Sequence, residues 1–200
     1  MRTVAAVLDK NGSHRQSRGH PIVTVRVWDP LVRIVHWSLA IAVALGWATT
    51  LPVLSAWHVA VGYVALALVA VRVVWGFVGP RAARFAAFVR SPRATWTYAR
   101  LAVRGRAQRH LGHNPLGGWM VLALFSCVAG LAATGWLYST DEFWGDRTVE
   151  RIHIDFAWAI VALAALHVAG VIVTGLVQRE NLVAAMLHGS KRDPAEGDVI

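Results

Sequence analysis

The chain has 200 residues, of which 56% are hydrophobic and 16% are charged, against about 25% charged residues in a typical soluble domain. The formal net charge is +9, but the basic residues gather beside long uncharged stretches, which argues against nucleic acid as a partner and favours a lipid bilayer. Cys127 is the single cysteine, which excludes an intrachain disulfide, a thiolate metal cluster and a haem attached through C-x-x-C-H.

The chain begins with a polar segment, residues 1–27. This segment lacks the apolar run of a secretory signal, so we expect it to stay attached as a flexible cytoplasmic extension. We expect a membrane domain at residues 28–178 and a cytoplasmic tail at residues 179–200.

Uncharged apolar stretches predict four transmembrane helices. No Asp, Glu, Lys or Arg occurs at positions 34–71, 110–140 or 156–178, and a helix needs about 20 apolar residues to cross a bilayer. The first stretch is long enough for two spans and the short turn 51–56 between them. We therefore expect an all-α, four-helix membrane bundle. Its spans are predicted at about Leu31–Leu51, Trp57–Phe77, Leu116–Leu137 and Ile152–Leu176.

The charges of the connecting segments predict the orientation. Residues 72–109 include nine arginines and no acidic residue, and the segment up to Arg33 has six basic residues against two acidic ones. Residues 141–151 have four acidic residues against two arginines. The positive-inside rule then places both termini and the central loop in the cytoplasm, and the acidic loop in the periplasm, of a bacterial inner membrane.

The central loop between the second and third spans predicts a further helix. Ser91 followed by Pro92 has the pattern of an N-cap and a first-turn proline. Beyond this start, apolar residues such as Trp96 and Tyr98 alternate with arginines. We interpret the segment as a basic amphipathic helix on the anionic inner leaflet; a solvated charged linker is the alternative.

Nine histidines divide into two groups. Five lie in expected loops or tails, where solvated or interfacial side chains are the default interpretation: His14, His20, His110, His113 and His188. An ionisable side chain inside a bilayer is costly and usually functional. Four histidines lie in the predicted spans: His36, His58, His153 and His167.

The depths of these four histidines predict two pairs. His153 and His167 are 14 residues apart, so they share one helix face at levels about 21 Å apart. His58 starts the second span at the periplasmic level of His153. His36 lies 15 residues before Leu51, or about 22 Å below that surface, at the level of His167. We expect His58 to face His153, and His36 to face His167.

Two imidazoles without further ligands suit haem iron, which the macrocycle holds at four positions, better than zinc. Each ligand should donate its other ring N–H to a carbonyl or hydroxyl. Arg33 and Arg72 are candidate partners for haem propionates, with ordinary positive-inside flanking charge as the alternative. Small residues on the facing helices leave room for a macrocycle, although ordinary helix packing also uses them. They are Gly62, Ala65, Gly117, Gly118, Gly130, Gly135, Ala157 and Ala164.

Several runs between about residues 25 and 192 resemble the bacterial cytochrome b561 family, which includes the cytochrome b subunits of nickel hydrogenases. The similar runs are Val27-Trp28-Asp29-Pro30 with Arg33 and His36-Trp37; His58 with Gly62-Tyr63, Arg72 and Trp75-Gly76-Phe77; Gly112-His113-Asn114-Pro115-Leu116-Gly117-Gly118; and His167 with Arg179-Glu180-Asn181-Leu182-Val183, Met186, Gly189 and Lys191. The resemblance implies a four-helix cytochrome b with two haems. It also implies that the ligands are His36, His58, His153 and His167.

The leading functional hypothesis is an electron-transfer protein with two non-covalent haems b. It would pass electrons between a quinone pool and a redox partner such as a c-type cytochrome or a dehydrogenase in a respiratory chain. The acidic loop Asp141–Glu150 is a candidate docking surface, with a plain solvated loop as the alternative. A quinone site is expected beside one haem, where Trp57 or Trp144 could line it.

Two alternatives stay open. The first is a stand-alone quinone oxidoreductase that acts on a small redox substrate such as superoxide. The second is a non-redox four-helix membrane protein with structural histidines. Whether the chain is an enzyme or an electron carrier is therefore left undecided by the sequence.

Overall fold

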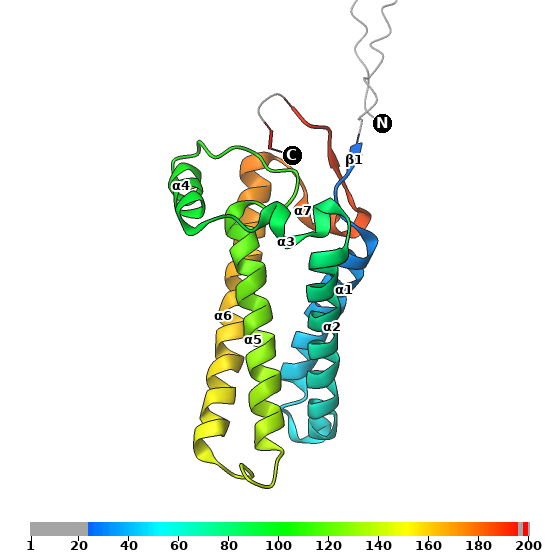
Figure 1. The fold of residues 1–200 in the computed structure, drawn as a ribbon, viewed down its shortest axis with the longest axis vertical. Helices are drawn as coiled ribbons and strands as arrows, with labels where there is room; N and C mark the ends of the chain where they lie inside the picture. The colour runs from blue at the N-terminus through cyan, green and yellow to red at the C-terminus, as the bar shows by residue number, and fades with distance from the viewer. Residues whose placement is uncertain (1–23, 196–197, 200) are drawn as a thin grey trace, which may run out of the picture.

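The structure is a computed structural model and describes residues 24–195, 198 and 199. Four long helices stand side by side, and each is long and apolar enough to cross a membrane (Figure 1). They are α1 (Pro30–Ala48), α2 (His58–Val78), α5 (Pro115–Tyr138) and α6 (Arg147–Gln178). The predicted all-α bundle with four membrane-spanning helices is confirmed.

Side-chain caps determine where the long helices begin. Asp29 Oδ1 accepts a hydrogen bond from the backbone N–H of Leu31 at 2.9 Å and so caps α1. Asp146 Oδ1 accepts one from the N–H of Thr148 at 2.7 Å and caps α6. Because of this cap, α6 begins at Arg147, five residues before the predicted span, and its first turns include the charged residues that mark the end of the apolar stretch.

Short elements gather at the two ends of the bundle (Figure 1). At one end, which we call the terminal end, lie η2 (Arg81–Ala83), α3 (Phe85–Phe88), α7 (Leu182–His188) and both ends of the described chain. At the other, the loop end, the 3-10 helix η1 (Pro52–Trp57) joins α1 to α2, and a turn joins α5 to α6. The expected antiparallel hairpin of the first two spans is therefore present.

The helix predicted in the central loop is α4 (Pro92–Val103), at the terminal end beside α5 (Figure 1). Ser91 Oγ accepts a hydrogen bond from Ala94 N–H at 3.3 Å, as its N-cap position predicts. Trp96 is 68% exposed, so this helix keeps a large aromatic side chain on the protein surface. Its placement on a lipid leaflet stays a prediction.

A two-stranded antiparallel sheet joins the segment before α1 to the segment after α7. Strand β1 (Thr24–Arg26) pairs with β2 (Ser190–Arg192). Residues 24–26 therefore form a strand, whereas we expected them to belong to a flexible extension. The partner strand lies in the C-terminal tail, and the hydropathy of the sequence does not show that the two segments pair. The rest of that expectation, residues 1–23 with His14 and His20, lies outside the described residues.

Packing divides the bundle into two hairpins. Helix α1 packs along α2, α5 packs along α6, and α2 also packs on α5. Helix α1 also meets α6 through side chains, since the ring centroids of Trp47 and Trp158 lie 5.1 Å apart. Cys127 belongs to the buried core. Its other buried members are Ala42, Ala65, Val69, Val128 and Ile160.

Candidate cofactor site: two histidine pairs

The four histidines of the spans meet in two pairs. His58 of α2 and His153 of α6 have ring centroids 6.1 Å apart and planes inclined at 70°. His36 of α1 and His167 of α6 have centroids 6.2 Å apart and planes inclined at 56°. These are the partners that their depths predict, and we call them the loop-end pair and the terminal-end pair.

The separation of the rings fits one metal ion between each pair. An imidazole nitrogen lies about 2 Å from a metal that it ligates, and the ring centre lies roughly 1 Å behind that nitrogen, so two rings on opposite sides of one ion have centres roughly 6 Å apart. The described residues contain no group of three or more His, Cys, Asp or Glu side chains that could hold a bare ion. A macrocycle such as haem would supply the four further ligands that a pair of imidazoles leaves to be filled.

Glycines beside the loop-end pair leave open space. A Cβ atom on Gly46 of α1 or on Gly62 of α2 would meet nothing within 4 Å, and Gly62 lies one turn after His58 on the same face of α2. By contrast, a Cβ on Gly130 would lie 2.6 Å from Cζ of Phe156. Gly130 therefore serves the packing of α5 on α6, whereas Gly46 and Gly62 leave room for a flat group.

A threonine determines the tautomer of His58. Its Nδ1 lies 3.1 Å from Oγ1 of Thr49, near the end of α1. The Thr49 hydroxyl also lies 2.8 Å from the carbonyl oxygen of Leu45. A carbonyl oxygen has no proton, so the hydroxyl must donate its own proton in this bond. The hydroxyl therefore accepts from Nδ1–H of His58, which leaves the lone pair of Nε2 free to bind a metal.

His153 has the same arrangement on the other side of the loop-end pair. Its Nδ1 lies 2.9 Å from Oγ1 of Thr134, whose hydroxyl lies 2.7 Å from the carbonyl oxygen of Gly130. The lack of a side chain at Gly135 gives the ring room, because a Cβ there would lie 3.3 Å from Cε1 of His153. Sequence reasoning expects a hydroxyl or carbonyl partner but does not identify these threonines, although each is a rare polar residue on an apolar span.

Polar atoms without partners occur in the half of the bundle that contains the terminal-end pair. Within the described residues, four side-chain nitrogens are buried and lack any hydrogen-bond partner. All four belong to the half of the bundle that contains the terminal-end pair. They are Nδ1 of His36, Nε1 of Trp37, Nη1 of Arg72 and Nδ1 of His113. Because buried polar groups are normally satisfied, this half of the bundle has the polar environment of a ligand site.

The two predicted arginines have different surroundings. Arg33 donates from Nε to the carbonyl oxygen of Met186 at 3.3 Å and from Nη2 to that of Leu187. It therefore holds the end of α7, and a role at a cofactor stays a prediction. Arg72 is only 4% exposed. It donates from Nη2 to the Ala83 carbonyl oxygen at 3.1 Å, and its guanidinium lies over the ring of Phe85.

His113 differs from the solvated side chain that its position before α5 suggests. Its ring centroid lies 4.7 Å from that of Trp28 and 4.5 Å from that of Phe88. Burial, together with the nearby charges of Arg72 and Lys191, lowers the pKa of His113 to about 3, so the ring is neutral. Helix α3 and the segment before α1 cover this loop, and neither contact is visible in the local sequence.

His110 and His188 lie closer to the surface of the terminal end. The His110 ring packs edge-on against Tyr98, and partial burial lowers the pKa of His110. His188 is exposed at the end of α7, as expected for a solvated side chain.

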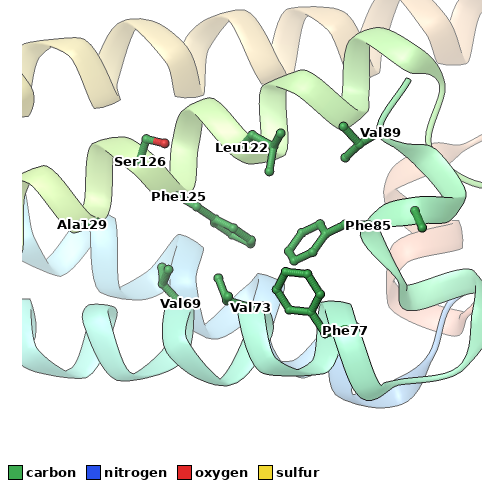
Figure 2. Close-up of a pocket in the computed structure, with 10 residues that line it drawn as sticks. Val69, Val73, Phe77, Phe85, Val89, Leu122, Phe125, Ser126 and Ala129 are labelled. Atoms are coloured by element: carbon green, nitrogen blue, oxygen red, sulfur yellow. The ribbon is translucent and has the colours of Figure 1, made fainter. Parts of the chain in front are cut away.

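An apolar groove of about 630 Å³ lies between α2, α3 and α5 (Figure 2). Phe77 and Phe85 approach each other at one end of it (Figure 2), and Ser126 is the one polar residue among those that line it. The remaining lining residues are Val69, Val73, Ala86, Val89, Leu122, Phe125 and Ala129. Trp57 and Trp144, which were expected near a quinone, are exposed and do not line this groove.

Comparison with known families gives one finding. The sequence model of the prokaryotic cytochrome b561 family matches residues 27–189, which include the four long helices, both histidine pairs and α7. A search of curated proteins finds no match to the chain.

Proposed function

Because the chain belongs to the prokaryotic cytochrome b561 family, whose members transfer electrons through haem b in a membrane, we propose that it holds two haems b. His58 and His153 would ligate one, and His36 and His167 the other. The observation that carries this proposal is the spacing of the two imidazole pairs, 6.1 Å and 6.2 Å between ring centroids.

The ligand set favours an electron carrier. Haem supplies one-electron chemistry when bound. His58 with His153, and His36 with His167, would hold each iron without leaving it a position for a substrate, so the haems would supply electron transfer and neither site would make or break substrate bonds. The hydroxyls of Thr49 and Thr134 would hold the loop-end imidazoles with Nε2 directed at the metal.

We propose that the terminal end faces the cytoplasm of a bacterial inner membrane. The arginine-rich segment between α2 and α5, with α4 in it, lies at this end. The acidic turn between α5 and α6 lies at the loop end, which would then face the periplasm. This distribution of charge is the one that the positive-inside rule requires.

The electron partners would be a membrane quinone and a second redox protein, such as a c-type cytochrome or a dehydrogenase. The groove of Figure 2 suits the apolar tail of a quinone, because hydrocarbon side chains line it and it adjoins the half of α2 nearest the terminal end. Asp141 and Glu142 are exposed in the acidic loop and offer a surface complementary to a basic partner.

Haem quantitation with a reduced-minus-oxidised spectrum tests the ligand assignment. We expect two haems b per chain. His58→Ala and His153→Ala should each lose the same haem, and His36→Ala and His167→Ala should each lose the other. His110→Ala is the control and should keep both. Colourless purified protein, or full haem content in all four ligand variants, would refute the proposal.

A further inference from the structure

Arg72 is a buried cation without a paired anion. Its side chain is 4% exposed, yet the described residues contain no carboxylate within ion-pair distance of it, and Nη1 has no partner. Asp29 acts on Arg72 electrostatically, but its Oδ1 accepts from the N–H of Leu31 and from Nε1 of Trp75. A buried charge is costly unless it is paired, so the guanidinium would be stabilised by an anion that the described residues do not provide.

His113 offers a second donor in the same region. Nδ1 of His113 is buried and lacks a partner, and its ring is held in place between Trp28 and Phe88. Phe85, over whose ring the Arg72 guanidinium lies, packs edge-on against Phe88, which contacts the His113 ring. A cation and a neutral N–H donor beside one histidine pair form the donor set that a carboxylate needs.

Resting on the proposed function, we propose that Arg72 and His113 form a buried carboxylate site that binds the propionates of the haem held by His36 and His167. Arg72 would supply the charge and His113 an uncharged hydrogen bond. The propionates of this haem would therefore point to the terminal end. His113 becomes a positioning residue for the cofactor, a role that its place in a loop does not suggest.

The depth of Arg72 favours a propionate over the headgroup of an anionic lipid. Arg72 lies six residues before the end of α2, and His36 lies six residues after the start of α1. Each is therefore roughly 9 Å from the terminal end of its helix. Arg72 thus lies at the same depth as His36, the proposed iron ligand. Phe85, which lines the apolar groove, also covers the guanidinium.

Potentiometric titration of both haems tests the site. The variants are Arg72→Gln, which removes the charge; Arg72→Lys, which keeps it; and His113→Phe, which keeps a ring between Trp28 and Phe88 but removes the donor. His110→Phe is the matched control, since it removes an imidazole from the same end of the bundle outside the site. Each variant is also made in a His58→Ala background, which should hold only the terminal-end haem.

A cation beside the propionates favours the reduced haem, because reduction adds an electron. Arg72→Gln should therefore shift the redox equilibrium of one haem at least tenfold toward the oxidised form, or 59 mV for a one-electron couple. His113→Phe should give a smaller shift in the same direction, about threefold. Arg72→Lys keeps the positive charge, so its shift should be smaller than that of Arg72→Gln. The same shifts should appear in the His58→Ala background, and His110→Phe should leave both potentials unchanged.

The results separate this inference from the proposed function. A wild-type protein without haem would refute the function itself. Two haems with unchanged potentials in Arg72→Gln and His113→Phe would overturn the carboxylate site alone, as would a shift confined to the loop-end haem. Loss of a co-purified anionic lipid from these variants, with both potentials unchanged, would assign the site to a headgroup instead.

Discussion

Nδ1 of His153 on α6 lies 2.9 Å from Oγ1 of Thr134 on α5. Nδ1 of His58 on α2 and Oγ1 of Thr49 on α1 repeat the arrangement at 3.1 Å. Each loop-end imidazole is thus held by a hydroxyl from the other helix of its own hairpin. The terminal-end pair differs, because Nδ1 of His36 is buried and has no partner among the residues that the structure describes, so the two sites are built differently.

Replacement of Thr134 by Val should weaken the loop-end haem. Valine keeps the shape of threonine but removes the acceptor for Nδ1–H of His153, and loss of such an outer partner typically costs about 10-fold to 100-fold in metal affinity. The rate of haem loss to excess apomyoglobin measures the effect. Thr140→Val is the control, because its hydroxyl donates to the Leu137 carbonyl oxygen and not to a histidine. Equal rates in the two variants would contradict the role of Thr134.

Replacement of Gly62 by Phe should exclude the loop-end haem while the helices still form. A Cβ atom at this position would meet nothing within 4 Å, so a larger side chain can extend into the space beside His58. We expect about half of the haem content with unchanged helical circular dichroism. Gly112→Phe fills open space in the loop before α5 and should keep both haems. Full haem content in Gly62→Phe would show that this space faces lipid.

The attachment of the C-terminal tail should depend on pH through Glu180. Burial alone would raise the pKa of Glu180, but hydrogen bonds from Arg109 and from the Arg192 N–H, with the charges of Lys191 and Arg109, lower the pKa overall. A carboxyl whose folded pKa lies below its unfolded value of 4.5 stabilises the fold above that pH. This contribution is lost as the pH falls through the lower folded pKa.

Hydrogen exchange of β2 measures this dependence. Protection of Ser190–Arg192 should be high at neutral pH and should fall below pH 4.5. Glu180→Gln removes the ion pair with Arg109, so its β2 should exchange faster at neutral pH and show little further change on acidification. Asp141→Asn, in the exposed loop at the opposite end of the bundle, should behave like wild type. An equal pH profile in Glu180→Gln would assign the effect to another group.

Cysteine labelling should establish the orientation. Cys127 is buried in the core, so the wild type should react little with a membrane-impermeant maleimide. Glu142→Cys lies in the exposed acidic loop and should be labelled from the periplasmic side of an intact inner membrane. Arg104→Cys, at the exposed end of α4, should be labelled only after the inner membrane is opened. The reverse pattern would invert the proposed orientation.

The sequence by itself determines the four spans and the partners within each histidine pair. Both follow from local properties: an uncharged apolar stretch becomes a membrane-spanning helix, and the fixed rise of a helix converts residue number into depth. His153 and His167 are 14 positions apart and therefore lie at separate levels. The cap at Asp146 is also a local feature, because an Asp at the N-cap precedes the first helical residue. It lies outside the apolar stretch, so α6 begins before the predicted span.

Only the tertiary structure decides what surrounds these side chains. Arg33 donates to the carbonyl oxygen of Leu187, 154 residues away in the chain, and His113 is covered by Trp28 and Phe88. The choice of Thr49 and Thr134 as histidine partners depends on how the helices of each hairpin are rotated toward each other. Such contacts between distant segments leave no periodic or local pattern in the sequence, because they arise only when the helices pack.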